Sequence, residues 1–174
     1  ITGWKKQRIA TLLQHQINLV GYHLPLDAHP EWGNNAQLAH KMGWQLERCT
    51  GEQNLLNIGC LPEAQSLAVL GAHLSAELGR DPVMAGDMAK QIKTLAWCTG
   101  GAQSFFTQAA SEGIDAYITG EISEPQYHLA HETGVAFISA GHHATERYGV
   151  QALAEAMKRQ FGLEIYFFDE QNPA

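Results

Sequence analysis

Segments with the hydrophobic period of a helix alternate with short apolar runs along this chain, and glycines separate them. Helical segments end at Gly79, Gly113, Gly134 and Gly162, and an apolar run follows each of the last three at once. A glycine just past a helix adopts the left-handed conformation that caps it, so a strand can begin without a long loop. Three such helix–strand units in succession predict an α/β fold.

The same pattern predicts elements along the whole chain. Helices are expected over residues 5–16, 34–42 and 63–78, from about 103 onward, and between the later strands. Strands are expected over residues 17–22, 55–61, 92–98, 115–119, 135–140 and 163–168. The least regular stretch, residues 48–54, is the expected boundary between two lobes. No apolar run approaches the ~20 residues that a membrane-spanning helix needs, so a membrane protein is not expected.

Composition narrows the class of protein further. A length of 174 residues is enough for one domain, or two small lobes, with a buried core. The net charge of −7 disfavours non-specific binding of duplex DNA by the average surface. Three cysteines without a C-x-x-C spacing argue against a disulfide framework and favour a reducing cytoplasm. Nine histidines prompt a search for metal-binding clusters.

Ligands in open α/β sheets bind beyond the carboxyl ends of the strands. Four of the predicted strands end in polar or glycine-rich sequence, at residues 23–30, 98–101, 119–121 and 141–146. Loops of α/β proteins are polar in general, so the position alone does not single out a site. The residue types within each loop must therefore show which of the four loops forms a site.

His142 and Glu146 are the most distinctive pair in these loops. They lie four residues apart at the start of a predicted helix, so both project from one face and can share a ligand. An imidazole and a carboxylate together suit Zn, Mn, Fe or Ni. The spacing also recurs by chance, so it is weak evidence by itself. His143 should point elsewhere and support either the site or the fold.

The loop after the first predicted strand offers a complement to that pair. Asp27 could be a carboxylate ligand, and His23 a ligand, an orienting residue or a proton carrier, with His29 nearby. Pro25 and Pro30 stiffen this turn. Aspartate is also common as a turn or cap residue next to proline, and the residues alone favour that structural role for Asp27.

Two further loops carry weaker signals. Backbone amides of residues 98–104 could face an anion at the start of the next helix, but the loop is neither G-x-G-x-x-G nor a P-loop. An unrelated nucleotide-binding α/β domain therefore has little support. Cys98 is expected to be a buried thiol rather than a nucleophile. Glu121 either places a carboxylate at the same edge or forms a polar turn.

Four segments match one family in order and spacing: YHLPLDAHPEWGNNAQLA, WCTGGAQSF, DAYITGEISE and AGHHATERYG. In these segments the chain resembles the Nif-three-like family, whose members are also called GTP cyclohydrolase type-two homologues. The resemblance runs over essentially all 174 residues. It implies two α/β lobes with layered helices and mixed sheets, in toroidal hexamers with dinuclear metal sites facing the interior. We expect a metal-site lobe of residues 1–50 and 141–174, and a second lobe of residues 51–140.

The resemblance also implies which residues bind metal. The aspartate of the family's H-x-x-x-D segment falls on Asp27, and its G-H-x-x-T-E motif falls on His142 and Glu146. Three further residues are expected near the site: His23, Glu121 and His143. The family's upstream His-His-Gly loop, with its two histidine ligands, has no match in this sequence. The three residues that do match are therefore expected to hold one ion rather than two.

Two classes of function follow as hypotheses. In the first, the protein is a metal-dependent hydrolase of a nucleotide or a phosphoester, with divalent metal as the cofactor. In the second, it is a non-enzymatic metal-binding ring protein with a regulatory or DNA-damage-protection role. The resemblance to the Nif-three-like family further implies a homo-oligomer, expected to be a hexamer. DNA is a possible partner that the net charge does not favour, and no membrane partner is expected.

Overall fold

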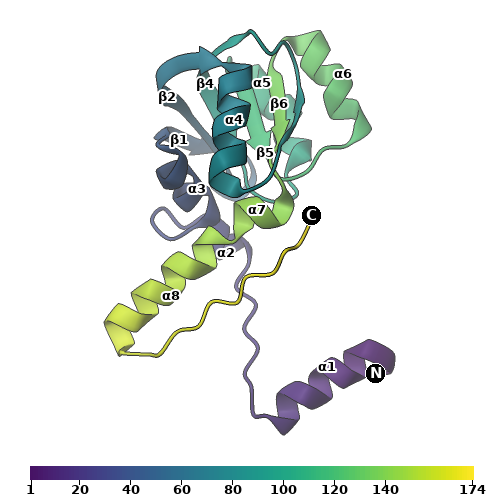
Figure 1. The fold of residues 1–174 in the computed structure, drawn as a ribbon, viewed down its shortest axis with the longest axis vertical. Helices are drawn as coiled ribbons and strands as arrows, with labels where there is room; N and C mark the ends of the chain where they lie inside the picture. Colours follow the sequence, from purple (N-terminus) through teal and green to yellow (C-terminus); the bar gives the residue numbers. More distant parts are fainter.

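A computed structural model describes residues 1–174 and contains one six-stranded mixed sheet with helices on both faces (Figure 1). The strands are β1 (Gln45–Thr50), β2 (Leu56–Ser66), β3 (Val83–Ala85), β4 (Gln91–Trp97), β5 (Ala116–Thr119) and β6 (Ala136–Ser139). Their order across the sheet is β1-β2-β4-β5-β6-β3. β4, β5 and β6 are parallel, and the other strands pair antiparallel with their neighbours. The predicted α/β class with a mixed sheet is confirmed.

The chain also forms eight helices. They are α1 (Gly3–Gln14), α2 (Leu24–Asp27), α3 (Asn34–Met42), α4 (Leu67–Leu78), α5 (Phe106–Ser111), α6 (Glu124–Thr133), α7 (His142–Glu146) and α8 (Tyr148–Phe161), with 3₁₀ turns at Glu52–Asn54 and Gln103–Phe105. One buried cluster joins α3, α4 and α7 to the sheet, and a second joins α5 and α6 to the opposite face. No helix combines the length and apolar character that crossing a membrane requires.

The central strands are apolar on both faces because both faces are covered. Ile118 of β5 packs into the cluster under α3 and α4, and its neighbour Tyr117 packs into the cluster under α5 and α6. Phe106 of α5 meets Phe137 of β6 edge to face, with ring centroids 4.9 Å apart. Parallel strands buried on both sides read as continuous apolar runs, which is the pattern that the sequence shows here.

The glycines that were expected to end helices do so. Gly79, Gly134 and Gly162 follow α4, α6 and α8 with φ values of 69°, 70° and 67°. Gly113 lies just beyond α5 with a φ of 74°. A side chain is strained at these angles, so glycine stops the helix and turns the chain toward the next strand.

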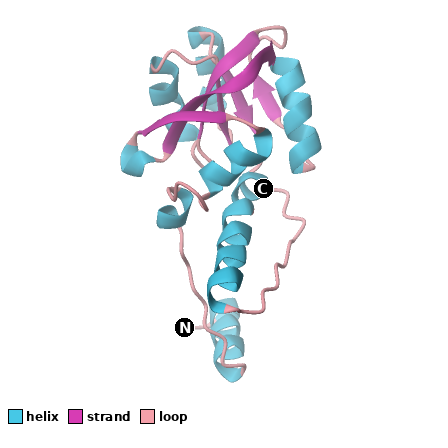
Figure 2. Cartoon of the chain, turned by 90° about the vertical axis from the view of Figure 1, so that its left-hand side faces the viewer, coloured by secondary structure: helices cyan, strands magenta, loops and turns pink.

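Two predicted strands are wrong. Residues 17–22 and 163–168 belong to no strand, although both runs are rich in apolar and aromatic residues. Their side chains are largely exposed, and no neighbouring strand pairs with either run. A strand is stable only when a neighbour satisfies its backbone groups and a packed face buries its side chains. Residues 17–22 instead connect α1 to the rest of the chain, and α1, which has no buried residue, lies far below the sheet in both views (Figures 1 and 2).

The helix that was predicted over residues 63–78 is α4, and it begins at Leu67, four residues later than predicted. The preceding residues extend β2, where Gln65 pairs with Ile92 of β4. Ser66 then ends the strand and caps the helix, because its Oγ accepts a hydrogen bond from the Val69 amide at 3.3 Å.

The division into lobes at residues 50 and 51 stays a prediction. β1 and β2, which lie on either side of it, pair within the one sheet.

Asp115 ties the start of β5 to β4. Its Oδ2 accepts hydrogen bonds from the backbone amides of Lys93 and Thr94 at 3.0 and 2.9 Å, and from Thr94 Oγ1 at 2.9 Å. Partial burial would raise the pKa of the Asp115 carboxyl, but these donors outweigh it and hold that pKa below its ordinary value.

We expect Asp115→Ala to lower the free energy of unfolding at pH 7 by about 1–2 kcal/mol. Hydrogen bonds to a charged acceptor stabilise the folded state, and the partial exposure of Asp115 weakens that stabilisation. The depressed pKa of the folded state means that this contribution is present above the unfolded pKa of about 3.9. It is lost as the pH falls through the folded pKa. Urea unfolding of both proteins between pH 7 and pH 2 measures it. A stability difference that stays constant down to pH 2 would contradict the assignment.

Candidate functional site

The loops that leave β4, β5 and β6 are held side by side at the carboxyl edge of the sheet. The Gly120 amide donates to the Gly100 carbonyl oxygen at 2.8 Å, and the Gly141 amide donates to the Gly120 carbonyl oxygen at 3.0 Å. These bonds continue the pairing of the parallel strands beyond their ends. The three loops therefore deliver their side chains to one place.

Glycine is required for this close approach. A Cβ on Gly120 would lie 2.6 Å from the Gly100 carbonyl oxygen and 2.6 Å from the Cα of His142, both of them backbone atoms. Gly100 has a φ of 70°, and a Cβ there would lie 2.0 Å from Oε1 of Glu146. The space that side chains would occupy at these positions is filled by the site itself.

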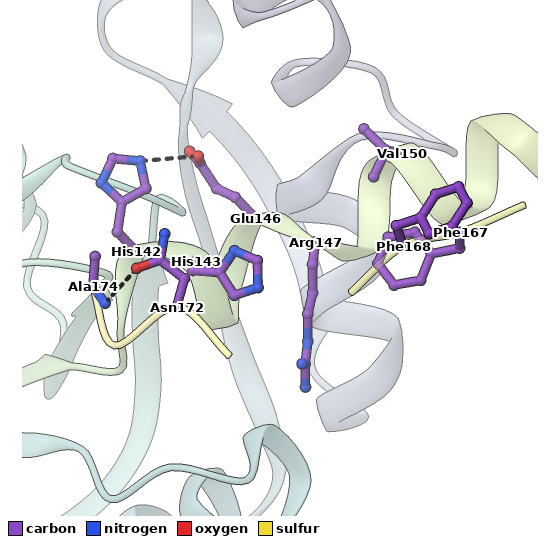
Figure 3. A pocket seen from close by; sticks show the side chains of 9 residues that line it. All are labelled: His142, His143, Glu146, Arg147, Val150, Phe167, Phe168, Asn172 and Ala174. Carbon is purple, nitrogen blue, oxygen red and sulfur yellow. Dashed lines mark hydrogen bonds and ion pairs between the residues drawn. The ribbon is translucent and has the colours of Figure 1, made fainter. Parts of the chain in front are cut away.

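His142 lies between two carboxylates. Its Nδ1 is 2.6 Å from Oε1 of Glu121, and its Nε2 is 3.0 Å from Oε2 of Glu146, one helical turn along α7 (Figure 3). Burial would lower the pKa of His142, but the hydrogen bond to Glu121 and the charge of Glu146 raise it above its ordinary value. The hydrogen bond from His142 lowers the pKa of Glu121. A proton on His142 would offset part of the negative charge of these two carboxylates.

Asp27 enters the site from the other end of the chain. It is 7% exposed at the end of α2, and its Oδ1 accepts a hydrogen bond of 2.6 Å from Nδ2 of Asn34. Asn34 Oδ1 in turn accepts from the Gly149 amide at 2.8 Å, which ties this corner to the start of α8. Burial raises the pKa of Glu146, and the negative charge of Asp27 raises it further.

Asp27, His142 and Glu146 line one pocket of about 240 Å³. Two carboxylates and an imidazole are donors that first-row divalent ions accept. The same pocket contains no lysine or arginine that could balance the two acids. Their side chains do not surround a common point, and no group of three or more His, Cys, Asp or Glu residues is arranged to hold an ion. The donors thus fit a metal in kind but not in their present arrangement, and binding would require His142 and Glu146 to exchange their mutual contact for the ion.

The remaining histidines of the prediction lie at different distances from this pocket. His23 sits at its rim, with a side chain 78% exposed and Nε2 4.0 Å from Oδ2 of Asp27. His143 points away from Glu146, and its Nε2 is 3.2 Å from Oδ1 of Asp169 near the C-terminal end (Figure 3). His29 shapes its own loop, because its Nδ1 accepts from the Trp32 amide at 3.0 Å and its ring stacks on Trp32.

Cys98 is a buried thiol that lines the pocket. Burial, followed by the charge of Asp27, raises its pKa to about 12. Such a thiol carries almost no thiolate at neutral pH and is a poor nucleophile. This agrees with the expectation from its position at the end of a strand.

A second, more open hollow of about 540 Å³ borders the site on the side of the C-terminal segment (Figure 3). It shares His142 and Glu146 with the first pocket, and Val150, Phe167 and Phe168 contribute its apolar lining. The His142–Glu146 pair therefore borders both hollows.

Sequence reasoning missed two buried polar residues that build the site. Asn34 orients Asp27, and Thr145 is fully buried. Thr145 Oγ1 accepts from the Gly100 amide at 3.0 Å and donates to the Gly141 carbonyl oxygen at 2.9 Å. Both residues lie in the segments that carried the resemblance. An asparagine or threonine at a helix start reads as an ordinary surface residue, so only the fold distinguished these two.

The family profile described as Duf34/NIF3 (NGG1p interacting factor 3) matches residues 1–173. This chain belongs to the Duf34/NIF3 family. Proteins named GTP cyclohydrolase 1 type 2 homolog are similar to it over its whole length. The protein from Neisseria meningitidis serogroup B is 63% identical over 174 residues, and those from Escherichia coli K12 and Pseudomonas aeruginosa are 48% and 46% identical. The chain covers 70% of each of these relatives.

Solved structures agree with the membership in the Duf34/NIF3 family. Protein ybgI, described as of unknown function, is 47% identical with a TM-score of 0.96, and the match covers all of this chain and 70% of that one. TTHA1606 from Thermus thermophilus is 32% identical with a TM-score of 0.86, over 100% and 69% of the two chains. Reduced HcgD from Methanocaldococcus jannaschii, at 22% identity and a TM-score of 0.76, shares the fold over 94% of this chain and 65% of that one.

We expect Gly120→Ala to destabilise this Duf34/NIF3 chain by about 1–3 kcal/mol, because the new methyl group meets backbone on two sides and cannot be accommodated by a rotamer change. For a domain of this size each kcal/mol lowers Tm by roughly 2–4 °C. Thermal unfolding followed by circular dichroism measures the shift. Gly21→Ala is the control, since a Cβ there has nothing within 4 Å. Equal melting temperatures for the two variants would count against the close approach at Gly120.

Proposed function

We propose that this chain binds a divalent metal ion and uses it to hydrolyse a nucleotide or a phosphoester. The observation that carries the proposal is the meeting of Asp27 with His142 and Glu146 at one pocket, although they lie near opposite ends of the sequence. The pocket lies at the carboxyl edge of the parallel strands, where α/β proteins place their ligands. The name of the similar proteins, GTP cyclohydrolase 1 type 2 homolog, is consistent with a hydrolytic role.

Asp27, Glu146 and Nε2 of His142 would hold the ion, and Zn, Mn, Fe or Ni would all accept this mixed set of oxygen and nitrogen donors. When bound, such an ion lowers the pKa of a coordinated water and polarises the bond under attack. The protein's own residues prepare the donors. Glu121 engages Nδ1 of His142 and leaves Nε2 for the pocket, and Asn34 engages Oδ1 of Asp27 and leaves Oδ2.

The first test is metal content per chain, measured by plasma mass spectrometry after dialysis. We expect Asp27→Asn and His142→Ala each to lose the metal that the parent protein retains, because the first replaces an anionic carboxylate ligand with a weaker neutral amide and the second removes the imidazole ligand. His143→Ala is the matched control, since its imidazole neighbours His142 in sequence but pairs with Asp169. Metal retained in the first two variants, or lost in the control, would contradict the assignment of the ligands.

The same samples decide between the two hypotheses of function. Hydrolysis of GTP or of p-nitrophenyl phosphate that rises with added metal and disappears in His142→Ala would support a hydrolase. Retained metal without turnover, together with a salt-sensitive complex with DNA, would favour the non-enzymatic metal-binding ring. A parent protein that binds no metal after reconstitution would reject both.

Glu121 is a positioning residue in this scheme, and its removal should weaken metal binding without unfolding the protein. We expect Glu121→Ala to reduce metal affinity by about 10–100-fold, as is usual when the partner of a histidine ligand is lost. Glu121→Gln should recover part of that loss, because its amide oxygen can still accept from Nδ1. A competitive chelator titration gives the affinities, and the melting temperature of the metal-free variants shows whether the fold is intact. Equal affinities for Ala, Gln and the parent would remove Glu121 from the site.

A further inference from the structure

The part of the 240 Å³ pocket that the metal donors do not form has a different chemistry. Leu24, Leu55, Ala102 and Phe105 supply apolar lining, and Ser104 lies at the surface end. None of the lining residues is lysine or arginine. The pocket is also smaller than the ~300–1,000 Å³ that sites for drug-sized ligands occupy. A small ring or planar group fits this space, and a complete nucleotide does not.

Thr99, which lines the same pocket, has a side-chain hydroxyl without a hydrogen-bond partner. The residue is only 5% exposed, and its Oγ1 is unpaired. Native structures leave few buried polar groups unpaired, and each calls for an explanation. Oγ1 is shielded from solvent in this rotamer, but Thr99 lines the pocket, so a group seated there can supply a partner once the hydroxyl turns toward it. A change of χ1 rotamer turns the hydroxyl without moving the backbone.

Thr119 shows what a structural threonine looks like at this edge of the sheet. It is 1% exposed, and its Oγ1 donates to the Gly100 carbonyl oxygen at 3.1 Å and accepts from the Ala102 amide at 3.2 Å. Both of its hydrogen-bonding capacities serve the fold. Thr99 has an equally buried hydroxyl in the adjoining loop and serves no such contact.

The charges of the pocket select among ligands. In the metal-free pocket, a phosphoester would bring further negative charge beside Asp27 and Glu146, and only the histidines of the lining could offset it. An uncharged ring avoids this repulsion and gains contact with Leu55 and Phe105. A hydroxyl suits a neutral amide, because it can donate to the carbonyl oxygen and accept from the N–H.

We propose that this pocket binds a small, uncharged, planar amide or nitrogen heterocycle, and that Thr99 is its specificity-determining hydrogen-bond partner. This inference rests on the proposed function, whose substrate class it narrows. Of the groups that a nucleotide presents, it is the base-like ring that enters beside Asp27 and Glu146, and the phosphates remain outside the pocket.

Two probes of similar size test the ligand class: 2-pyridone, a neutral cyclic amide, and phenyl phosphate, an anion. Their affinities are measured by saturation-transfer NMR titration on the full chain, both metal-free and reconstituted. We expect 2-pyridone to bind the metal-free protein at least tenfold more tightly than phenyl phosphate. Failure of 2-pyridone to show saturable binding, or a preference for phenyl phosphate in the metal-free protein, would overturn the inference.

Thr99→Val tests the role of the hydroxyl while keeping the shape of the side chain. We expect a loss of 2-pyridone affinity of about 3–10-fold, the usual net effect of one neutral hydrogen bond. The melting temperature of the metal-free protein should stay the same or rise, because an unpaired buried hydroxyl has been removed. Thr119→Val is the matched control and should melt at a lower temperature, since it leaves the buried Ala102 amide without its acceptor and removes a second hydrogen bond to the Gly100 carbonyl oxygen.

Unchanged 2-pyridone affinity in Thr99→Val, or a loss of melting temperature as large as that of Thr119→Val, would assign the Thr99 hydroxyl to the fold and refute the proposal. The metal measurements are read separately. A parent that binds 2-pyridone but no metal would reject the proposed function and keep the pocket's ligand class. A parent that binds metal but not 2-pyridone would reject the pocket's ligand class and keep the proposed metal binding.

Discussion

The backbone contact between Gly100, Gly120 and Gly141 is the constraint on which the site depends. These residues follow three parallel strands, and their amide–carbonyl bonds hold the loops in register one step beyond the sheet. The absence of a side chain at Gly120 lets this backbone approach within hydrogen-bonding distance. Glu121 directly follows Gly120 and His142 directly follows Gly141, so the 2.6 Å contact between Glu121 and His142 follows from this register. The fold and the site are therefore held by the same bonds.

Electrostatic balance is the second constraint. Glu121 and Glu146 both contact the imidazole of His142, Asp27 lines the same pocket as His142 and Glu146, and the pocket lining offers no lysine or arginine. Despite burial, the two carboxylates raise the pKa of His142, and burial together with the charge of Asp27 raises the pKa of Glu146, whereas the hydrogen bond with His142 lowers the pKa of Glu121. A proton on His142 offsets only one of these negative charges. A divalent cation offsets them more completely, which is why the donor set supports a metal-binding proposal.

Some features of this arrangement follow from local rules. The spacing of His142 and Glu146 puts them on one face of any helix, and α7 places them 3.0 Å apart. The glycine that ends each helix, and the apolar run after it, predicted β5 and β6 to within a residue or two. The resemblance to the Nif-three-like family pointed to Asp27 as a partner of the pair, and the family membership is now shown. The ligand roles of these residues stay predictions.

The sequence by itself determined the helix ends, the central parallel strands and the face shared by His142 and Glu146, because each depends on residues a few positions apart. Tertiary structure decided the rest. Residues 17–22 and 163–168 have the composition of strands, but a strand needs a neighbour, and the sheet offers them none. Asn34, Thr145 and Thr99 are all short polar residues in a loop or at a helix start, and the sequence does not distinguish their roles. The side chains of Asn34 and Thr145 have buried hydrogen-bond partners and that of Thr99 has none, a difference that arises only when distant segments meet.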